Sequence, residues 1–86
     1  MVDLEISPSA SKFLERLKKS RKPIADRIKE NIDSLRTDPL KGKKLLGELS
    51  DFRSLRVGEH RVLYTVIQER ILIQVVKIGH RREIYR

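Results

Sequence analysis

The sequence contains no cysteine and no tryptophan, and aromatic residues make up only 5% of its 86 residues. Without cysteine, neither a disulfide framework nor a thiolate metal site can support the fold. No apolar run approaches the roughly 18 residues that a membrane-spanning helix needs. The N-terminus shows no cationic segment followed by an apolar stretch, so the cytoplasm is the expected location. This length predicts one domain, residues 1–86, stabilised by packing alone or by packing and a bound partner.

Several common catalytic motifs are missing as well. The two histidines come without cysteine, without HExxH spacing and without close carboxylate clusters, which argues against a metal site. No glycine-rich phosphate loop follows a predicted strand, and no serine lies in a nucleophile elbow. We therefore expect neither a metal nor a cofactor.

Positive charge is abundant, with a formal net charge of +8. Residues 1–40 hold nine lysines and arginines against seven acidic residues, whereas residues 41–86 hold 11 against five. The excess therefore lies in the C-terminal half. Such a surface attracts polyanions or acidic proteins, although a basic domain without a specific ligand is equally compatible with charge alone.

The N-terminal half predicts a strand followed by two helices. Apolar and polar residues alternate over residues 2–6, as in a half-buried strand, and the Ser7-Pro8-Ser9 segment ends it and supplies a helix N-cap. Phe13 and Leu17 mark one face of a first helix. Pro23 suits the first turn of a second helix, whose apolar stripe consists of Ile24, Ile28, Ile32 and Leu35. The short connection predicts an antiparallel helical hairpin.

After Gly42 the pattern changes to that of strands, predicted at residues 52–57, 61–68 and 71–78. A turn at Gly58-Glu59 joins the first two strands, and Gly79 is expected to end the third. The run at 71–78 is apolar on both faces, which predicts the central and most buried strand. The fold class is therefore α+β, with an N-terminal strand, a helical hairpin and a mostly antiparallel meander.

The side chains left for chemistry are cations, histidines and a tyrosine, which could clamp a phosphodiester during attack by the neighbouring 2′-hydroxyl. If Leu55 points to the core, Ser54 and Arg56 lie on the opposite face of their strand. If Val62 and Tyr64 face the helices, Arg61 projects near Arg56. The alternative is that both arginines are sheet-surface charges whose stems cover apolar neighbours.

Two segments carry a family resemblance. The run Asp51 to Tyr64 closely resembles the "RSLRVGDYRVLY" stretch of RelE/ParE-superfamily toxins, and Lys77 to Tyr85 resembles their "GHRREVY" ending. Residues 42–49 resemble their "KLKGEL" segment, and the element order agrees over the whole chain. The resemblance implies the RelE-like microbial RNase fold.

For the RelE type, the resemblance implies cleavage of messenger RNA in the ribosomal A site without a metal. It carries catalytic roles onto Arg56, Arg61, Arg81 and Tyr85, with Arg61 and Arg81 as phosphate clamps and Tyr85 as the acid/base candidate. Ser54 stands where the family has a second lysine. The other predicted RNA contacts are Lys43, Lys44, Arg53, His60, His80 and Arg82, of which the histidines are alternative acid/base groups.

The resemblance also implies partners: messenger RNA and the ribosome, a cognate acidic RelB-like antitoxin, and a higher-order toxin–antitoxin complex on operator DNA. Two rival functions remain open. One is a ParE-type toxin that inhibits DNA gyrase by binding without chemistry of its own. The other is a degenerate member that retains only antitoxin and operator binding.

Overall fold

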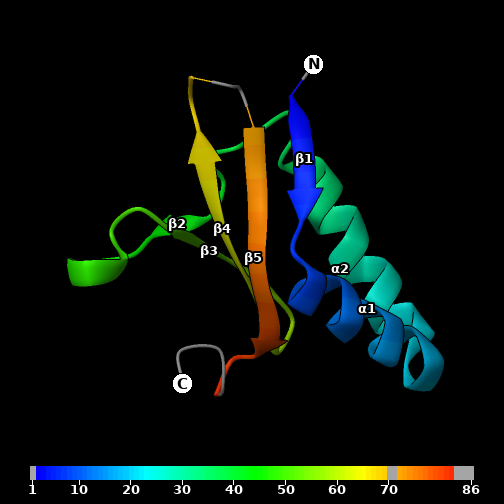
Figure 1. Cartoon of the computed structure of the whole chain (residues 1–86). Helices are drawn as coiled ribbons and strands as arrows, with labels where there is room; N and C mark the ends of the chain where they lie inside the picture. Colours follow the sequence, from blue (N-terminus) through cyan, green and yellow to red (C-terminus); the bar gives the residue numbers. More distant parts are fainter. Residues whose placement is uncertain (1, 70–71, 83–86) are drawn as a thin grey trace.

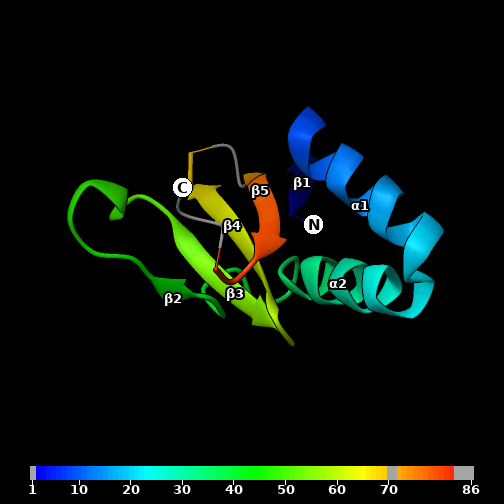
Figure 2. The same ribbon diagram turned by 90° about the horizontal axis from the view of Figure 1, so that it is seen from below.

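The computed structural model describes residues 2–69 and 72–82. Its sheet has the strand order β1-β5-β4-β3-β2, in which β1 and β5 are parallel and the other neighbours antiparallel. Both helices lie on one side of this sheet, which confirms the predicted α+β class (Figure 1; Figure 2). The elements are β1 (Asp3–Ile6), α1 (Pro8–Ser20), α2 (Lys22–Ser34), β2 (Lys43–Lys44), the 3-10 turn η1 (Gly47–Leu49), β3 (Arg53–Val57), β4 (His60–Ile67) and β5 (Leu72–His80).

The starts of both helices agree with the sequence, through the Ser7 cap of α1 and through Pro23 in the first turn of α2. The Ser7 hydroxyl accepts a hydrogen bond from the Ala10 N–H at 3.2 Å and itself donates to the Val76 carbonyl at 2.6 Å. This serine therefore starts α1 and also ties that start to β5. A single residue, Arg21, joins α1 to α2, and Pro23 lies in the first turn of α2. Neither helix of the described chain is long and apolar enough to cross a membrane.

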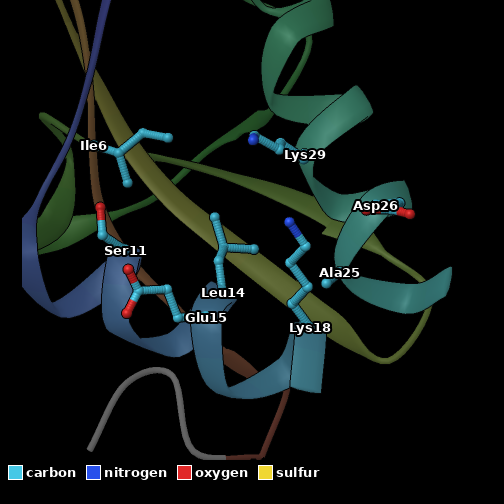
Figure 3. A pocket seen from close by; sticks show the side chains of 8 residues that line it. All are labelled: Ile6, Ser11, Leu14, Glu15, Lys18, Ala25, Asp26 and Lys29. Atoms are coloured by element: carbon cyan, nitrogen blue, oxygen red, sulfur yellow. The ribbon is translucent and has the colours of Figure 1, made fainter. Parts of the chain in front are cut away.

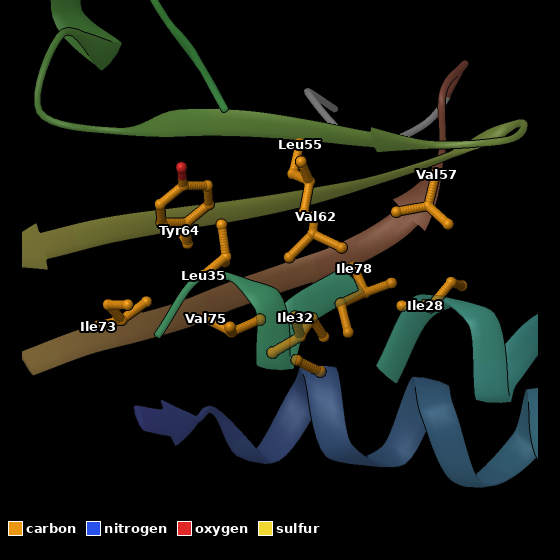
Figure 4. Packing of buried hydrophobic residues seen from close by; sticks show 11 residues of the cluster. Ile28, Ile32, Leu35, Leu55, Val57, Val62, Tyr64, Ile73, Val75 and Ile78 are labelled. Carbon is orange, nitrogen blue, oxygen red and sulfur yellow. The ribbon is translucent and has the colours of Figure 1, made fainter. Parts of the chain in front are cut away.

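The core lies between the helices and the helix-facing side of the sheet (Figure 4). The predicted stripe of α2 supplies Ile28 and Ile32, which with Leu35 just beyond the helix are completely buried. Val62 and Tyr64 from β4, with Leu55 from β3, meet them from the sheet. The predicted orientation of these strands is thereby confirmed, because Leu55 and Val62 are cross-strand partners that both face the helices.

Strand β5 differs from the prediction in two respects. It continues beyond Gly79 to His80, because Arg61 and His60 of β4 extend the ladder with these two residues. Its position is second from the edge rather than central, because the short β1 pairs along its outer side while β3 and β2 follow β4. β4 is therefore the middle strand.

The pairing of β4 with β5 contains a register shift between Leu63 and Tyr64. Leu63 pairs with Lys77 and Tyr64 with Val75, so Val76 is an extra residue of β5. This irregularity lets Val75 and Ile78, three positions apart, both enter the core. It also explains why the sequence of β5 looks apolar on both faces.

Candidate nucleic-acid interface

The side of the sheet that faces away from the helices is called the open face below. Leu55 and Val62 form a cross-strand pair that faces the helices, so the next pair along the strands, Arg56 and Arg61, projects from the open face. The two arginines are direct partners in the register, which places their side chains side by side. Arg56 and Arg61, two of the predicted site residues, are therefore neighbours in the structure.

The two guanidinium groups have neutral hydrogen-bond partners. Arg61 Nη1 donates to the Ser54 hydroxyl at 3.4 Å, and Arg56 Nε donates to the Gly58 carbonyl at 3.2 Å. Among the described residues, neither arginine forms an ion pair with a carboxylate. Like charges directly opposite on neighbouring strands are destabilising, and an anion held between them removes that penalty. The pair is thus suited to hold a phosphate.

Two lysines extend this positive surface across the sheet. Lys43 of β2 is the cross-strand partner of Ser54, and Lys77 of β5 is the partner of Leu63. Because Ser54 and Leu63 are themselves partners, one row of side chains crosses four strands on the open face. Lys77 was not among the predicted residues. The signal for it was its charge, the only one in the predicted strand 71–78.

Arg81 follows the last residue of β5, next to the turn between β3 and β4. Its backbone N–H donates to the Glu59 carbonyl at 2.9 Å, which continues the β4–β5 ladder past the last strand residue. The neighbouring residue of that turn, Gly58, is the one that accepts from Arg56. Arg81 and Arg82 are exposed, and Tyr85 lies outside the described residues.

Arg53 and Lys44, two predicted RNA contacts, project from the helix-facing side instead. Arg53 is the partner of both Lys44 and the buried Tyr64 in the register, so all three share that side. Arg53 Nη1 donates to the carbonyls of Gly42 at 2.9 Å and Leu40 at 3.4 Å. These hydrogen bonds connect the segment before β2 to β3, so Arg53 stabilises the fold at this place.

The two histidines also lie apart from the arginine pair. The His60 ring meets Phe13 of α1 at 5.8 Å between centroids and His80 at 5.9 Å, both edge to face. Partial burial and the neighbouring His80 lower the pKa of His60, with Glu59 opposing and Arg21 adding to the effect. His80 Nε2 lies 3.5 Å from Glu59 Oε2, and His80 Nδ1 accepts from the Arg82 N–H at 3.3 Å. This pair packs the end of the sheet against α1.

No group of histidine and carboxylate side chains in residues 2–69 and 72–82 is arranged to hold a metal ion. The chemistry available on the open face is that of cations that bind and polarise an anion.

Comparison with known proteins identifies the family of this chain. Residues 4–85 match the family model of the ParE toxin of type II toxin–antitoxin systems. The chain belongs to this toxin family. RelE4 of Methanocaldococcus jannaschii, a toxin by its name, is 29% identical to this toxin over 87 aligned positions that cover 100% of the chain and 93% of the relative.

Solved toxin structures share the fold. The Mycobacterium tuberculosis RelBE2 toxin–antitoxin complex contains a chain with a TM-score of 0.81 and 26% identity, and the match covers 92% of this toxin and 96% of that chain. The YoeB/ParE toxin from Agrobacterium tumefaciens has a TM-score of 0.80 at 20% identity, with 92% and 98% covered. The intact Escherichia coli RelBE complex gives a TM-score of 0.77 at 18% identity, with 93% and 96% covered. This toxin is therefore a member of the RelE/ParE superfamily.

Proposed function

We propose that this toxin is an endoribonuclease that cuts messenger RNA on the ribosome and thereby stops translation in the cytoplasm. The observation that carries the proposal is the Arg56–Arg61 pair. The two arginines lie opposite each other on β3 and β4, and neither has a carboxylate partner among the described residues. A phosphodiester of RNA supplies the missing negative charge. The exposed Arg81 beside the β3–β4 turn provides a third cation for the same group.

The proposed reaction is attack of a 2′-hydroxyl on the adjacent phosphorus. The hydroxyl loses its proton to a base, the bond from phosphorus to the 5′-oxygen breaks, and that oxygen takes up a proton. The products are a 2′,3′-cyclic phosphate and a free 5′-hydroxyl. Arg56, Arg61 and Arg81 would stabilise the extra negative charge of the transition state, and Tyr85 would transfer the proton.

A phenol is a weak base at neutral pH, so Tyr85 alone would accelerate the reaction only modestly. We therefore expect the reaction to need the ribosome as well. The ribosome would hold the 2′-oxygen, phosphorus and 5′-oxygen in line, which can contribute several kcal/mol to the rate. Free RNA would lack that orientation and would be cut slowly.

The deciding experiment is cell-free translation with added toxin, followed by mapping of RNA ends. We expect discrete cuts inside translated codons and much slower cleavage of the same RNA without ribosomes. Arrested translation with intact messenger RNA would contradict the endoribonuclease proposal. Equally rapid cleavage of naked single-stranded RNA would contradict the ribosome dependence.

A second candidate function follows from the family match, because the matching model is that of ParE toxins. In this alternative the toxin inhibits DNA gyrase by binding and performs no chemistry. A supercoiling assay with purified gyrase separates the two functions. Loss of supercoiling together with intact RNA in the translation assay would favour this alternative.

We also propose an acidic, RelB-like antitoxin as the partner that neutralises this toxin, alone or in a larger complex on operator DNA. The RelBE2 and RelBE structures named above contain toxin and antitoxin together. A groove of about 260 Å³ lies between α1, α2 and the end of β1 (Figure 3). Its apolar floor is Ile6, Leu14 and Ala25, and charged residues complete its rim: Glu15, Lys18, Asp26 and Lys29. An amphipathic helix fits such a surface by placing apolar side chains on the floor and carboxylates beside the lysines.

Charge reversal at the rim of this groove should weaken the binding of the antitoxin. We expect the double variant Lys18→Glu/Lys29→Glu to bind the proposed acidic antitoxin about tenfold more weakly, which corresponds to about 1.4 kcal/mol. RNA cleavage should be unaffected, because the groove lies on the helical side of the molecule. Titration calorimetry measures the affinity, and Lys12→Glu on the same helix but outside the groove is the control. Equal weakening by the control would mean that only net charge matters.

A further inference from the structure

We infer that single-stranded RNA crosses the strands of the open face, and that Lys43 and Lys77 hold the phosphates on either side of the one bound by Arg56 and Arg61. This inference rests on the proposed endoribonuclease function and extends it from one phosphate to a path for the substrate. It also assigns a cation to the place where Ser54 carries no charge.

The register defines the path. Lys43, Ser54, Leu63 and Lys77 occupy successive positions in one row across β2, β3, β4 and β5. Neighbouring strands are about 4.8 Å apart, so the two lysine Cα atoms at the ends of the row are about 14 Å apart. Side chains stand roughly perpendicular to a sheet, so with extended stems the two ammonium groups project about as far apart as their Cα atoms. The lysines therefore serve different phosphates, one on each side of the central pair.

The arginines lie between these two ends, in the next row of the same face. Arg56 and Arg61 are two residues further along β3 and β4 than Ser54 and Leu63, a displacement of about 7 Å along the strands. Guanidinium groups bind a phosphate through two parallel hydrogen bonds, whereas the lysine ammonium is a mobile point charge on a long stem. The arginines suit the phosphate that reacts, and the lysines suit the backbone that leads to it and away from it.

Ser54 acquires a positioning role in this arrangement. Its side chain is buried, and its hydroxyl accepts the hydrogen bond from Arg61 Nη1 at 3.4 Å. A hydroxyl here orients the Arg61 guanidinium, while the charge comes from the adjacent strand. Lys43 is exposed on β2 directly beside Ser54. Lys43 therefore supplies a cation next to a position that carries no charge.

The far edge of the sheet limits the path. On the open face of β1, Glu5 is the partner of Gln74 and accepts a hydrogen bond from its amide at 3.3 Å. A carboxylate at this edge repels phosphate groups. The positive surface therefore extends from β2 to β5 and stops before β1.

The test is the salt dependence of RNA binding by the full-length toxin. The probe is a short fluorescein-labelled RNA with 2′-O-methyl riboses, which cannot be cleaved because the attacking hydroxyl is blocked. Fluorescence anisotropy gives the binding constant at a series of sodium chloride concentrations. The slope of log K against log salt is negative, and each phosphate contact that is lost makes it shallower by about 0.7 for single strands. We expect Lys43→Gln and Lys77→Gln each to reduce the slope by about this amount.

Lys44→Gln is the matched control. Lys44 follows Lys43 in the same short strand and is equally exposed, but it shares the face of Arg53 rather than that of Ser54. Its replacement should leave the slope unchanged. If Lys43→Gln has no effect, or if Lys44→Gln has the same effect, the path is wrong. Cell-free translation separates the two proposals: intact messenger RNA there would overturn the proposed function, whereas unchanged salt slopes in Lys43→Gln and Lys77→Gln would overturn only the path.

Discussion

Replacing Arg61 with alanine is expected to lower the rate of ribosome-dependent cleavage by about 10²–10³-fold, which is the usual loss when one donor to transition-state charge is removed. Arg81→Ala is expected to do the same. Arg61 lies beside Arg56 on the open face, and Arg81 follows β5 next to the turn that Arg56 contacts. Single-turnover cleavage of messenger RNA in stalled ribosomal complexes measures the effect without product release.

The double variant tests whether the two arginines hold one phosphate. Groups that act on the same phosphate are not independent, so Arg61→Ala/Arg81→Ala should lose less than the product of the single losses. Lys44→Ala is the control, because it removes an exposed cation from the other face of the sheet. A loss in Lys44→Ala as large as that in Arg61→Ala would indicate diffuse attraction to RNA and would refute the assigned site.

The sequence predicted the arginine pair only on the condition that Val62 and Tyr64 face the helices. Alternation separates Arg56 from Leu55 and Arg61 from Val62, but β4 is apolar on both faces, so alternation alone did not decide the face of Arg61. The same alternation separates His60 from Arg61, because adjacent residues of a strand point to opposite faces. His60 therefore lies on the face opposite the arginine pair.

Long-range pairing could not be predicted in the same way. The position of Lys43 beside Ser54 depends on a two-residue strand that has no pattern of its own. The place of β5 depends on its parallel pairing with β1, which joins residues far apart in the chain. The extra residue Val76 shifts the alternation within β5, so the side on which Lys77 projects follows from the structure and not from its position in the run.

Tyr64 brings a hydrogen-bonding hydroxyl into the described core. The ring is completely buried. Its hydroxyl donates to the Pro39 carbonyl at 2.7 Å and accepts from the Gly42 N–H at 2.9 Å. Burial raises the pKa of Tyr64 above its usual value of 10.0, and the Gly42 hydrogen bond partly opposes this. One phenol thus holds the segment that leads from α2 to β2 and Lys43.

Tyr64→Phe should therefore be among the most destabilising single-atom deletions in this toxin. It leaves the buried Gly42 N–H and the part-buried Pro39 carbonyl without this partner, at about 1–3 kcal/mol for a fully buried group. In a domain of this size, 1 kcal/mol lowers Tm by roughly 4–8 °C. Thr65→Val is the control, because the Thr65 hydroxyl makes a bond of the same 2.7 Å length to the Asp51 carbonyl in an exposed place. Equal losses in Tm would show that burial of the Tyr64 bond is not the cause.

The buried Tyr64 hydroxyl should also make the stability of the toxin depend on pH. Above pH 10 the unfolded chain ionises its Tyr64 phenol while the folded chain keeps it protonated, so wild-type stability should fall as pH rises from there through the folded pKa. Denaturant titrations of Tyr64→Phe should lack that part of the fall in stability.

Gly42→Ala tests the same contact from the Gly42 side. A Cβ at this position would lie 2.7 Å from both Cε1 and the hydroxyl of Tyr64 and 3.1 Å from the Ser54 carbonyl. The buried ring cannot give way cheaply, so we expect a loss of about 1–3 kcal/mol. Combining Gly42→Ala with Tyr64→Phe, which removes one of the two clashing atoms, should cost less than the sum of the single changes. Strict additivity would mean that Gly42 and Tyr64 stabilise the fold independently.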